Sequence, residues 1–143
     1  MNISVSLQHE SLSISNMEVL EYIWQLPQTI AAFIYFTYLS NRNEILDTCT
    51  FQGAIVFIKK NAGGSVTLGN HIFLSPKATD NTVRHEWGHT RQSLLLGPLY
   101  LIIIGIPSIV WAAIHKRVAT TRSYYLFYTE SWAVRLGGVI RKY

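Results

Sequence analysis

The longest apolar pattern near the N-terminus runs through "MEVLEYIWQLPQTIAAFIYFTYLS", residues 17–40, and predicts a helix. Glu18 and Glu21 mark its N-terminal end, where the helix dipole favours negative charge. Pro27 lacks a backbone N–H, so it should kink this helix or divide it. Residues 1–16 are polar, rich in serine and without periodicity, which predicts a flexible N-terminal arm.

Two runs of β-branched and aromatic residues follow, "FQGAIVFIKK" (51–60) and "SVTLGNHIFLSP" (65–76). The glycine-containing loop "NAGG" separates them, and Pro76 closes the second run. We therefore predict one β-hairpin made of these two strands. We expect this hairpin to lie beside the helix that follows it.

Three further helices are predicted in the C-terminal half of the chain. Thr79 or Asp80 can cap the first of them, which should end at Gly97–Pro98. An apolar helix follows to about Ile114, and a last one runs over about 123–137. The pattern as a whole predicts a mostly helical α+β protein with about four helices and one hairpin.

Two apolar stretches, residues 22–39 and 94–114, are long enough to be considered as membrane spans. With two spans, the loop between them and the C-terminal tail would each carry six Lys and Arg residues. The positive-inside rule therefore favours neither orientation. Gly and Pro residues also interrupt the second stretch, as in a broken or re-entrant element. Two interpretations stay open: true spans, or a buried or membrane-dipping pair of helices.

The composition points to a membrane surface, a partner or a tightly buried small fold. Hydrophobic residues make up 49% of the chain and charged residues 14%, below the roughly 25% usual for soluble domains. The net charge of +4 suits anionic lipid. No basic stripe interleaved with aromatic residues is present, so we do not expect nucleic-acid binding. We expect a membrane-associated or integral membrane protein, or otherwise a cytoplasmic one.

The length and the N-terminus bound the organisation further. At 143 residues the chain can build one core, so residues 17–143 are expected to form a single domain. The first 41 residues hold no Lys or Arg, and no signal peptide is expected because such a peptide needs a basic n-region. Cys49 is the one cysteine, which excludes a disulfide framework and a Cys-based metal site.

The motif with the clearest chemistry is "HEWGH", residues 85–89. On a helix His85 and His89 are one turn apart, so both imidazoles project from one face and can bind one zinc ion. The carboxylate of Glu86 can then act as general base toward the water that zinc activates. Gly88 leaves room for a neighbouring element. Coincidence is the alternative, because short motifs carry a false-positive risk.

A catalytic zinc site needs a third protein ligand. After His89 the chain contains no Asp, one Glu and one more His, which are Glu130 and His115. Glu130 lies in an otherwise acid-free, aromatic-rich stretch, where a buried carboxylate is costly unless it is paired or binds metal. We predict Glu130 as the third ligand, His115 as the reserve ligand and His71 as a weaker choice.

The neighbours of Glu130 support this assignment and also offer an alternative. Ala133, one turn further along the predicted helix, is small enough to allow close helix packing. A surface salt bridge is the alternative role of Glu130, with Arg135 or Arg122 as its partner.

The motif followed by a distant Glu in an E-x-x-A context resembles the gluzincin type of zinc metallopeptidase. More closely, "GGSVTLGNHIFLS", "RHEWGHTRQSLLLGPLYLIIIGIPSIVWA" and "YYLFYTESWAVRLGGV" resemble small bacterial proteins, and metallopeptidase modules ending some polymorphic toxins, with HEYGH motifs. The resemblance covers about residues 63–139, with Trp87 where Tyr is expected. It implies a minimal zincin-like domain in which His85, His89 and Glu130 bind zinc and Glu86 is the base.

In gluzincin-like enzymes a strand beside the active helix aligns the peptide substrate through main-chain hydrogen bonds. The segment Ser65–Ser75 is the candidate here, and a plain structural hairpin is the alternative. A hydrolase also needs a donor for the developing oxyanion. The candidates are the tyrosines just before the proposed third ligand: Tyr124, Tyr125 and Tyr128. Gln92 is expected to support the metal ligands, and Arg91 to be solvated.

We therefore expect a zinc-dependent metallopeptidase that hydrolyses a peptide or protein substrate, with one Zn²⁺ per chain and Glu86 as general base. A catalytically silent zinc-binding module, acting as a toxin, immunity or scaffold component, is the first alternative. A small membrane protein without metal is the second.

Overall fold

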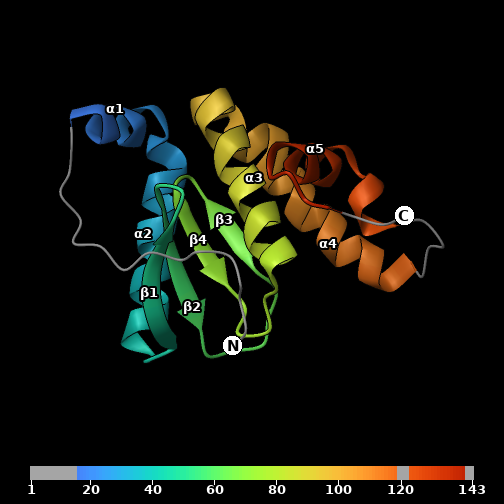
Figure 1. Ribbon diagram of the computed structural model, residues 1–143, viewed down its shortest axis with the longest axis horizontal. Coiled ribbons are helices and arrows are strands. Elements are labelled where there is room, and N and C mark those ends of the chain that lie inside the picture. Colours follow the sequence, from blue (N-terminus) through green and yellow to red (C-terminus); the bar gives the residue numbers. More distant parts are fainter. Residues whose placement is uncertain (1–15, 119–122, 141–143) are drawn as a thin grey trace.

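The computed structural model describes residues 16–118 and 123–140, and it places a β-sheet among helices (Figure 1). The elements are α1 (Asn16–Trp24), α2 (Leu26–Asn41), β1 (Ile45–Phe51), β2 (Ala54–Lys59), β3 (Val66–Leu68), β4 (His71–Leu74), α3 (Asp80–Leu96), the 3₁₀ turn η1 (Gly97–Leu99), the π-helical turn η2 (Leu101–Gly105), α4 (Ile106–Val118), the 3₁₀ turn η3 (Tyr124–Leu126) and α5 (Tyr128–Leu136). They confirm the predicted mostly helical α+β fold. The predicted arm lies outside the described residues, except for Asn16, which begins α1.

The sheet has four strands in the order β1-β2-β4-β3. β1 pairs antiparallel with β2, β2 pairs parallel with β4, and β4 pairs antiparallel with β3. The predicted pairing of 51–60 with 65–76 as one hairpin is therefore wrong. Each run belongs to its own hairpin, and the two hairpins meet through the parallel pair of β2 and β4.

Tight two-residue loops explain this pairing. Gln52 and Gly53 join β1 to β2 with φ angles of 47° and 84°, and Gly69 precedes Asn70 between β3 and β4 with φ of 63°. A positive φ in such a loop gives the turn whose twist matches antiparallel strands. The side chain of Asn70 also donates to the carbonyl of Gly53 at 2.8 Å, which joins the two turns. The antiparallel partners are therefore neighbours in sequence, and the longer connection joins β2 to β3.

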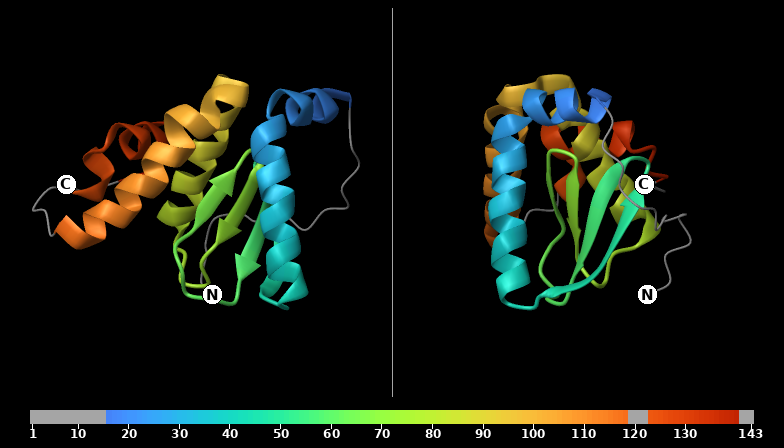
Figure 2. Two further views of the ribbon diagram at one scale, coloured as in Figure 1. Left: turned by 180° about the vertical axis from the view of Figure 1, so that it is seen from behind. Right: turned by 90° about the vertical axis from the view of Figure 1, so that its left-hand side faces the viewer.

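The two faces of the sheet carry different helices (Figure 2). Alternation along each strand sends successive side chains to opposite faces, which separates the core into two clusters. On the α3 face the buried cluster includes Val56, Ile72, Leu74 and Val83, with Trp87 packed against it. On the α2 face the cluster is formed by Ala32, Leu39, Phe57 and Phe73, with Tyr35 and Phe36 among the residues packed against it.

The helix predicted over 17–40 is divided into α1 and α2 at the buried Gln25. Pro27 lies in the first turn of α2, where its missing N–H leaves no helical bond unmade. The break is tied to the end of α3 by hydrogen bonds. Ser93 Oγ donates to Gln25 Oε1 at 2.6 Å, and Gln28 Nε2 donates to the carbonyl of Gly97 at 2.6 Å.

α3, the helix that carries the HEWGH motif, begins and ends where the sequence predicts. Thr79 is the N-cap: its hydroxyl accepts from the backbone N–H of Thr82, whose side chain accepts from the backbone N–H of Thr79. This reciprocal pair satisfies two backbone donors at the helix start. Gly97, with φ of 51°, ends the helix. Both predicted ends are confirmed.

The apolar stretch 94–114 is not one helix but the end of α3, the turns η1 and η2, and the first part of α4. Pro107 cannot donate to the carbonyl of Ile103, and the Tyr128 hydroxyl donates to that carbonyl instead at 2.6 Å. Within the part of the chain that the structure describes, no helix combines the length and the apolar character needed to cross a bilayer.

Candidate metal centre and active site

The site forms where α3 packs closely against α5. A side chain carbon added at Gly88 would collide with the carbonyl of Ala133, and one at Gly137 would collide with the carbonyl of Arg84. The helices can therefore approach this closely only with glycine at both positions. This confirms that Gly88 leaves room for a neighbouring element. The atoms of Ala133 that face Gly88 belong to its backbone, so the role of its small side chain stays a prediction.

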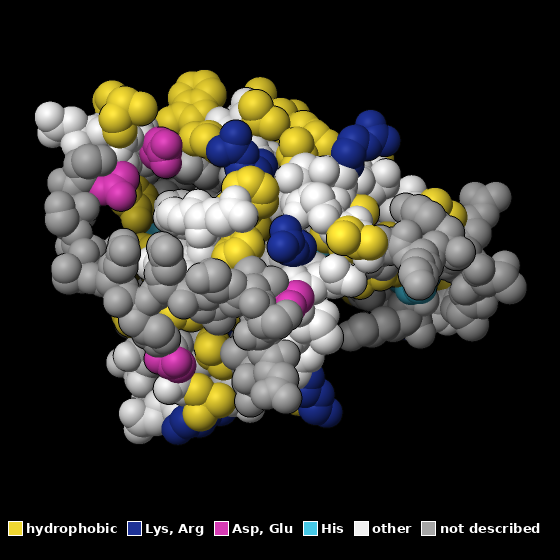
Figure 3. Space-filling view, viewed as in Figure 1, with side chains coloured by type: hydrophobic (Ala, Val, Ile, Leu, Met, Phe, Trp, Pro, Cys, Tyr) yellow, Lys and Arg dark blue, Asp and Glu magenta, His cyan; other side chains and the backbone are white. Residues whose placement is uncertain are grey.

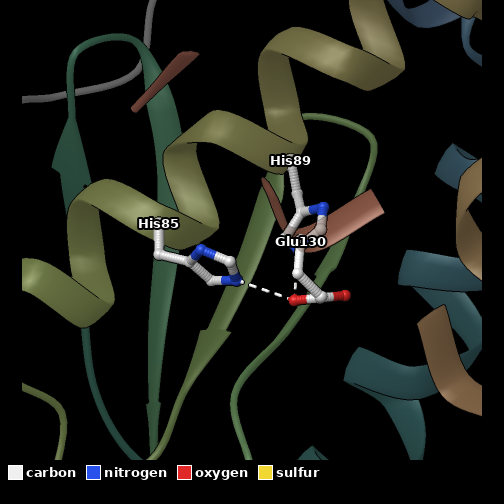
Figure 4. A group of neighbouring side chains, drawn as sticks. All are labelled: His85, His89 and Glu130. Carbon is white, nitrogen blue, oxygen red and sulfur yellow. Dashed lines mark hydrogen bonds and ion pairs between the residues drawn. The ribbon is translucent and has the colours of Figure 1, made fainter. Parts of the chain in front are cut away.

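Three side chains with metal-binding atoms converge at this helix contact: His85 and His89 from α3, and Glu130 from α5 (Figure 4). All three are buried, and their ligand atoms lie within 4.8 Å of one another. Glu130 Oε2 lies 3.0 Å from His85 Nε2 and 3.6 Å from His89 Nε2. The structure thus brings together the three residues predicted as ligands. Two imidazole nitrogens and one carboxylate oxygen are a donor set that zinc takes in catalytic sites.

The tautomer of His89 follows from its hydrogen bonds. Gln92 Nε2 donates to the carbonyl of Thr129 at 2.8 Å, and a carbonyl can only accept, so the amide orientation is settled. Gln92 Oε1 then faces His89 Nδ1 at 2.7 Å, and Nδ1 must carry the proton. In the neutral imidazole, His89 Nε2 then carries a lone pair that faces Glu130 Oε2 at 3.6 Å, whereas in the protonated imidazole Nε2 donates to that oxygen. The predicted supporting role of Gln92 agrees with this geometry, since Gln92 is fully buried while Arg91 is exposed.

A lone pair on His89 Nε2 and a carboxylate oxygen of Glu130 are both acceptors, yet they face each other in a buried position. This pairing is favourable only when a proton or a cation is shared between the two atoms. Burial alone would lower the pKa of His89, but its hydrogen bond with Glu130 and the charge of Glu86 raise that pKa overall. The residues therefore fit a positive charge between them, either a proton or a bound metal cation.

Glu130 is held so that its two oxygens have separate partners. Ser108 Oγ and Thr129 Oγ1 donate to Oε1, while Oε2 faces the two histidines. Burial would raise the pKa of Glu130, but the hydrogen bonds from His85 and His89 hold it well below its ordinary value. Glu130 is only 1% exposed, so the alternative of a surface salt bridge with Arg135 is wrong; Arg122 lies outside the described residues.

Glu86, the predicted base, is held by strand β3. Its Oε2 accepts a hydrogen bond from the Thr67 hydroxyl at 2.6 Å, and the side chain is only 7% exposed. Thr67 reaches Glu86 because it is the middle residue of β3 and alternation directs it to the α3 face. The carboxylate thus lies beside the three converging side chains with one oxygen already occupied.

A cavity of about 690 Å³ adjoins these residues. Its wall contains edge strand β3, the N-terminal part of α3, the turn η2 and α4, together with His85, Glu86, His89 and Glu130. Among the described residues β3 pairs with β4 alone, at the edge of the sheet, and it lies within the predicted segment Ser65–Ser75. The cavity therefore offers space for a ligand between this edge strand and the candidate metal ligands.

The predicted tyrosines separate into two groups. Tyr124 and Tyr125 line the cavity, and Tyr125 meets the His85 ring edge to face at 5.4 Å. Burial and the nearby Glu130 charge raise the pKa of Tyr124, so its hydroxyl keeps its proton near neutral pH. Tyr128 does not line the cavity, because its hydroxyl is bonded to the carbonyl of Ile103.

The two reserve histidines are not part of the converging group. His115 lines the cavity, where its ring packs against Trp111 and Tyr124 at 5.1 Å and 5.5 Å. His71 lies on β4, where its ring stacks on Phe57 in the layer that faces α2. Neither is close enough to His85 and His89 to join a shared cation in this arrangement.

The sequence did not reveal Thr67, Ser108 or Tyr100 as parts of the site. Tyr100 is buried at the cavity wall, and its hydroxyl donates to the Thr67 carbonyl at 3.4 Å. Alternation in "SVTLGN" was the one available signal for Thr67, because a polar residue between two apolar ones in a strand points to the opposite face. Nothing local marks Ser108 or Tyr100.

Comparison with known proteins finds no matching family model, no similar curated protein and no similar solved structure. The chemistry of the site is therefore argued from the residues that form it.

Proposed function

We propose that this protein is a zinc-dependent peptidase of gluzincin-like type, with zinc held by His85, His89 and Glu130. The observation that carries the proposal is the convergence of His85, His89 and Glu130 in a buried position, where the pair of His89 Nε2 and Glu130 Oε2 needs a proton or a cation between its two atoms. A zinc ion bound there would lower the pKa of water and polarise a substrate carbonyl.

Glu86 is the general base in this proposal. Its carboxylate takes a proton from water and later passes the proton to the amine that leaves when the peptide bond breaks. The Thr67 hydroxyl holds Oε2, which leaves Oε1 to carry the proton. Adjacent helical residues do not face the same point, so Glu86 is a base beside the ligands and not a fourth ligand.

The substrate is expected to be a peptide or protein segment that enters the cavity beside β3. An extended segment can pair with a strand edge through main-chain hydrogen bonds, and β3 is an edge strand in the cavity wall. Tyr124 and Tyr125 are the candidate donors to a developing oxyanion. The raised pKa of Tyr124 keeps that hydroxyl protonated and able to donate.

We also propose that the enzyme acts at a membrane surface. The chain is poor in charged residues, at 14%, and carries a net charge of +4, which favours contact with anionic lipid.

The decisive experiment compares wild type with Glu86→Gln after both are loaded with zinc. The substitution keeps the shape and removes the base, so zinc content and melting temperature should stay close to wild type. Hydrolysis of a mixed peptide library, or self-cleavage read by mass spectrometry, should fall about 10²- to 10⁴-fold. Wild-type hydrolysis by the zinc-loaded variant would overturn the mechanism. Zinc binding without hydrolysis in either protein would favour the catalytically silent zinc module.

The ligand assignment is tested separately by metal analysis of Glu130→Ala and His115→Ala. Glu130→Ala should lose zinc, because one of three protein ligands is removed, while His115→Ala should retain it. The opposite pattern would transfer the ligand role to His115, and zinc retained by both variants would exclude both assignments.

A further inference from the structure

Two segments of the chain expose many large apolar side chains. No charged residue occurs between Glu21 and Arg42 or between Arg91 and Lys116. The first segment contains α2 and the second contains η2 and most of α4. The large apolar side chains exposed on α2, on η2 and on this part of α4, called the apolar face below, are Leu26, Ile30, Phe33, Ile34, Tyr38, Ile102, Ile103, Ile106, Ile109, Val110 and Ile114. A surface helix normally has polar residues on its outward face. Because these two helices have apolar residues there instead, they need a nonpolar environment.

Both helices lie on the same side of the molecule. Seen from behind, α2 and α4 stand in front, with the strands between them (Figure 2). The opposite side carries Lys, Arg, Asp and Glu side chains of the described residues (Figure 3). That side also shows hydrophobic side chains among the charged ones.

The apolar face includes the rim of the active-site cavity. Ile106 and Ile109 line the cavity and are also 59% and 62% exposed, so they belong to both surfaces. Whatever covers the apolar face therefore also lies beside the part of the cavity that α4 lines. A substrate that reaches the cavity along this rim must itself come from that environment.

Fluid lipid fits this face better than a folded partner does. A protein interface has a rim of polar groups that specify the partner, but the outward side of α2 offers few. Even the hydroxyl of Thr37, on that side, donates to the carbonyl of Phe33 at 2.8 Å. Acyl chains also adapt to two separate helices, whereas a second protein would need a matching shape.

The C-terminal end of α4 carries positive charge. Arg117 lies in its last turn with an exposed side chain, whereas Arg42, which follows α2, forms an ion pair with Glu44 at 2.9 Å. Cations beside an apolar surface can contact anionic headgroups while the apolar side chains enter the acyl boundary. This charge pattern favours an anionic membrane over a neutral one.

We infer that the apolar face rests on an anionic lipid membrane and that the cavity takes peptide segments presented at that membrane. The substrate class rests on the proposed peptidase function, whereas the lipid contact does not. The protein lies on the membrane surface through α2, η2 and α4. Substrates are segments that emerge from the lipid or lie along it, with apolar side chains near the bond that is cut.

Flotation of the full chain with lipid vesicles tests the contact. Vesicles of phosphatidylcholine and phosphatidylglycerol should carry the wild type to the top of a density gradient, and pure phosphatidylcholine vesicles should carry less. The double variant Phe33→Glu/Ile102→Glu changes side chains that are 69% and 67% exposed. Its lipid partitioning should fall about tenfold or more, because two large apolar groups are lost from the contact.

The matched control is Leu46→Glu/Ile140→Glu, which introduces the same charge at side chains that are 56% and 83% exposed and lie outside the apolar face. It should float nearly like wild type. Equal losses in both double variants, or wild type that stays with the lipid-free fraction, would overturn the proposal. A wild-type dimer without lipid that Phe33→Glu/Ile102→Glu alone dissociates would instead assign the face to a second copy of the chain.

A third measurement keeps this proposal separate from the catalytic one. Glu86→Gln should float like wild type, because it leaves the apolar face unchanged. If the wild-type protein hydrolyses peptides, it should cut a peptide tethered to vesicle lipid faster than the same peptide free in solution. Equal rates for the two peptides would remove the membrane-presented substrate class, even if flotation succeeds.

Discussion

The α2 side of the sheet is closed by aromatic rings, whereas the α3–α5 contact is closed by buried polar groups. In the first region, called the aromatic layer, Phe73 packs against Tyr35 and Phe57 with ring centroids 4.7 Å and 5.1 Å away. In the second, called the polar layer, Gln92 connects the imidazole of His89 to the backbone of α5. Both regions are buried, yet the forces that close them differ.

Apolar packing is non-directional and depends on how well the volume is filled. A substitution in the aromatic layer should therefore lower the free energy of unfolding in proportion to the contacts that are lost. Buried polar groups need a particular partner at a particular distance, and loss of one partner leaves the other unpaired. Substitutions in the aromatic layer should therefore lower stability. Loss of a hydrogen-bonding side chain in the polar layer should act mainly on metal binding and on the chemistry proposed for the site.

Gly88→Ala should break the polar layer and have the largest effect on folding. The new methyl group meets the Ala133 carbonyl, which is backbone and cannot rotate away. We expect the free energy of unfolding to fall by about 4 kcal/mol or more, which is more than overpacking of a core usually costs. Urea unfolding followed by circular dichroism measures the change.

Gly64→Ala is the control for this substitution. A methyl group at Gly64 has no atom within 4 Å, and the backbone there does not need a positive φ. Its stability should equal that of wild type or rise slightly, because alanine restricts the unfolded chain. A Gly88→Ala protein as stable as Gly64→Ala would mean that the two helices are not held this close.

Phe73→Ala should weaken the aromatic layer without disturbing the proposed metal centre. Phe73 is fully buried, and its removal leaves a cavity between α2 and the sheet. The expected loss is about 3–4 kcal/mol, whereas Phe73→Leu should lose less because it keeps most of the volume. Zinc affinity of the folded protein should be unchanged for both, as isothermal titration calorimetry can establish. A large drop in affinity would show that the two layers are coupled.

How much could be predicted from the sequence differs between the two layers for a physical reason. α3 could be located with both ends, because Thr79 and Gly97 act within one helical turn. The converging residues could be named because few His, Asp and Glu residues follow the motif. Such signals are local or depend on residue type, and the structure places His85, His89 and Glu130 together.

Strand pairing could not be predicted in the same way. The apolar pattern of runs 51–60 and 65–76 does not show which strands pair with each other. The tight loops at Gln52 and Gly69 decide that β1 pairs with β2 and β3 with β4. Residues that act across elements were missed for the same reason. The contact of Thr67 with Glu86 depends on the placement of β3 beside α3, which no local pattern encodes.

Gln92→Leu should lower zinc affinity by about 10- to 100-fold, the usual effect of removing a group that orients a metal ligand. The change leaves His89 Nδ1 and the Thr129 carbonyl without their partner. Gln28→Leu is the matched control, because Gln28 is also a fully buried glutamine with two hydrogen bonds. Both variants should lose stability, but only Gln92→Leu should lose zinc affinity. Zinc affinity can be measured by competition with a chelating dye. Equal zinc affinities of Gln92→Leu and Gln28→Leu would contradict this role of Gln92.

Thr67→Val should have the smallest and most selective effect. Valine fills the same space but has no hydroxyl, so Glu86 loses the hydrogen bond at Oε2 while the metal ligands keep theirs. A lost hydrogen bond to a charged group corresponds to about 1.5–3 kcal/mol, and we expect kcat to fall by roughly 10- to 100-fold. Zinc content should be unchanged, because the hydrogen bonds from the Thr67 side chain run to Glu86 and not to the three converging side chains. Thr67→Ser should restore most of the activity, since it returns the hydroxyl to the same strand position. If Thr67→Val lowers zinc content as strongly as Gln92→Leu does, the hydroxyl supports the metal centre as a whole and not the base alone.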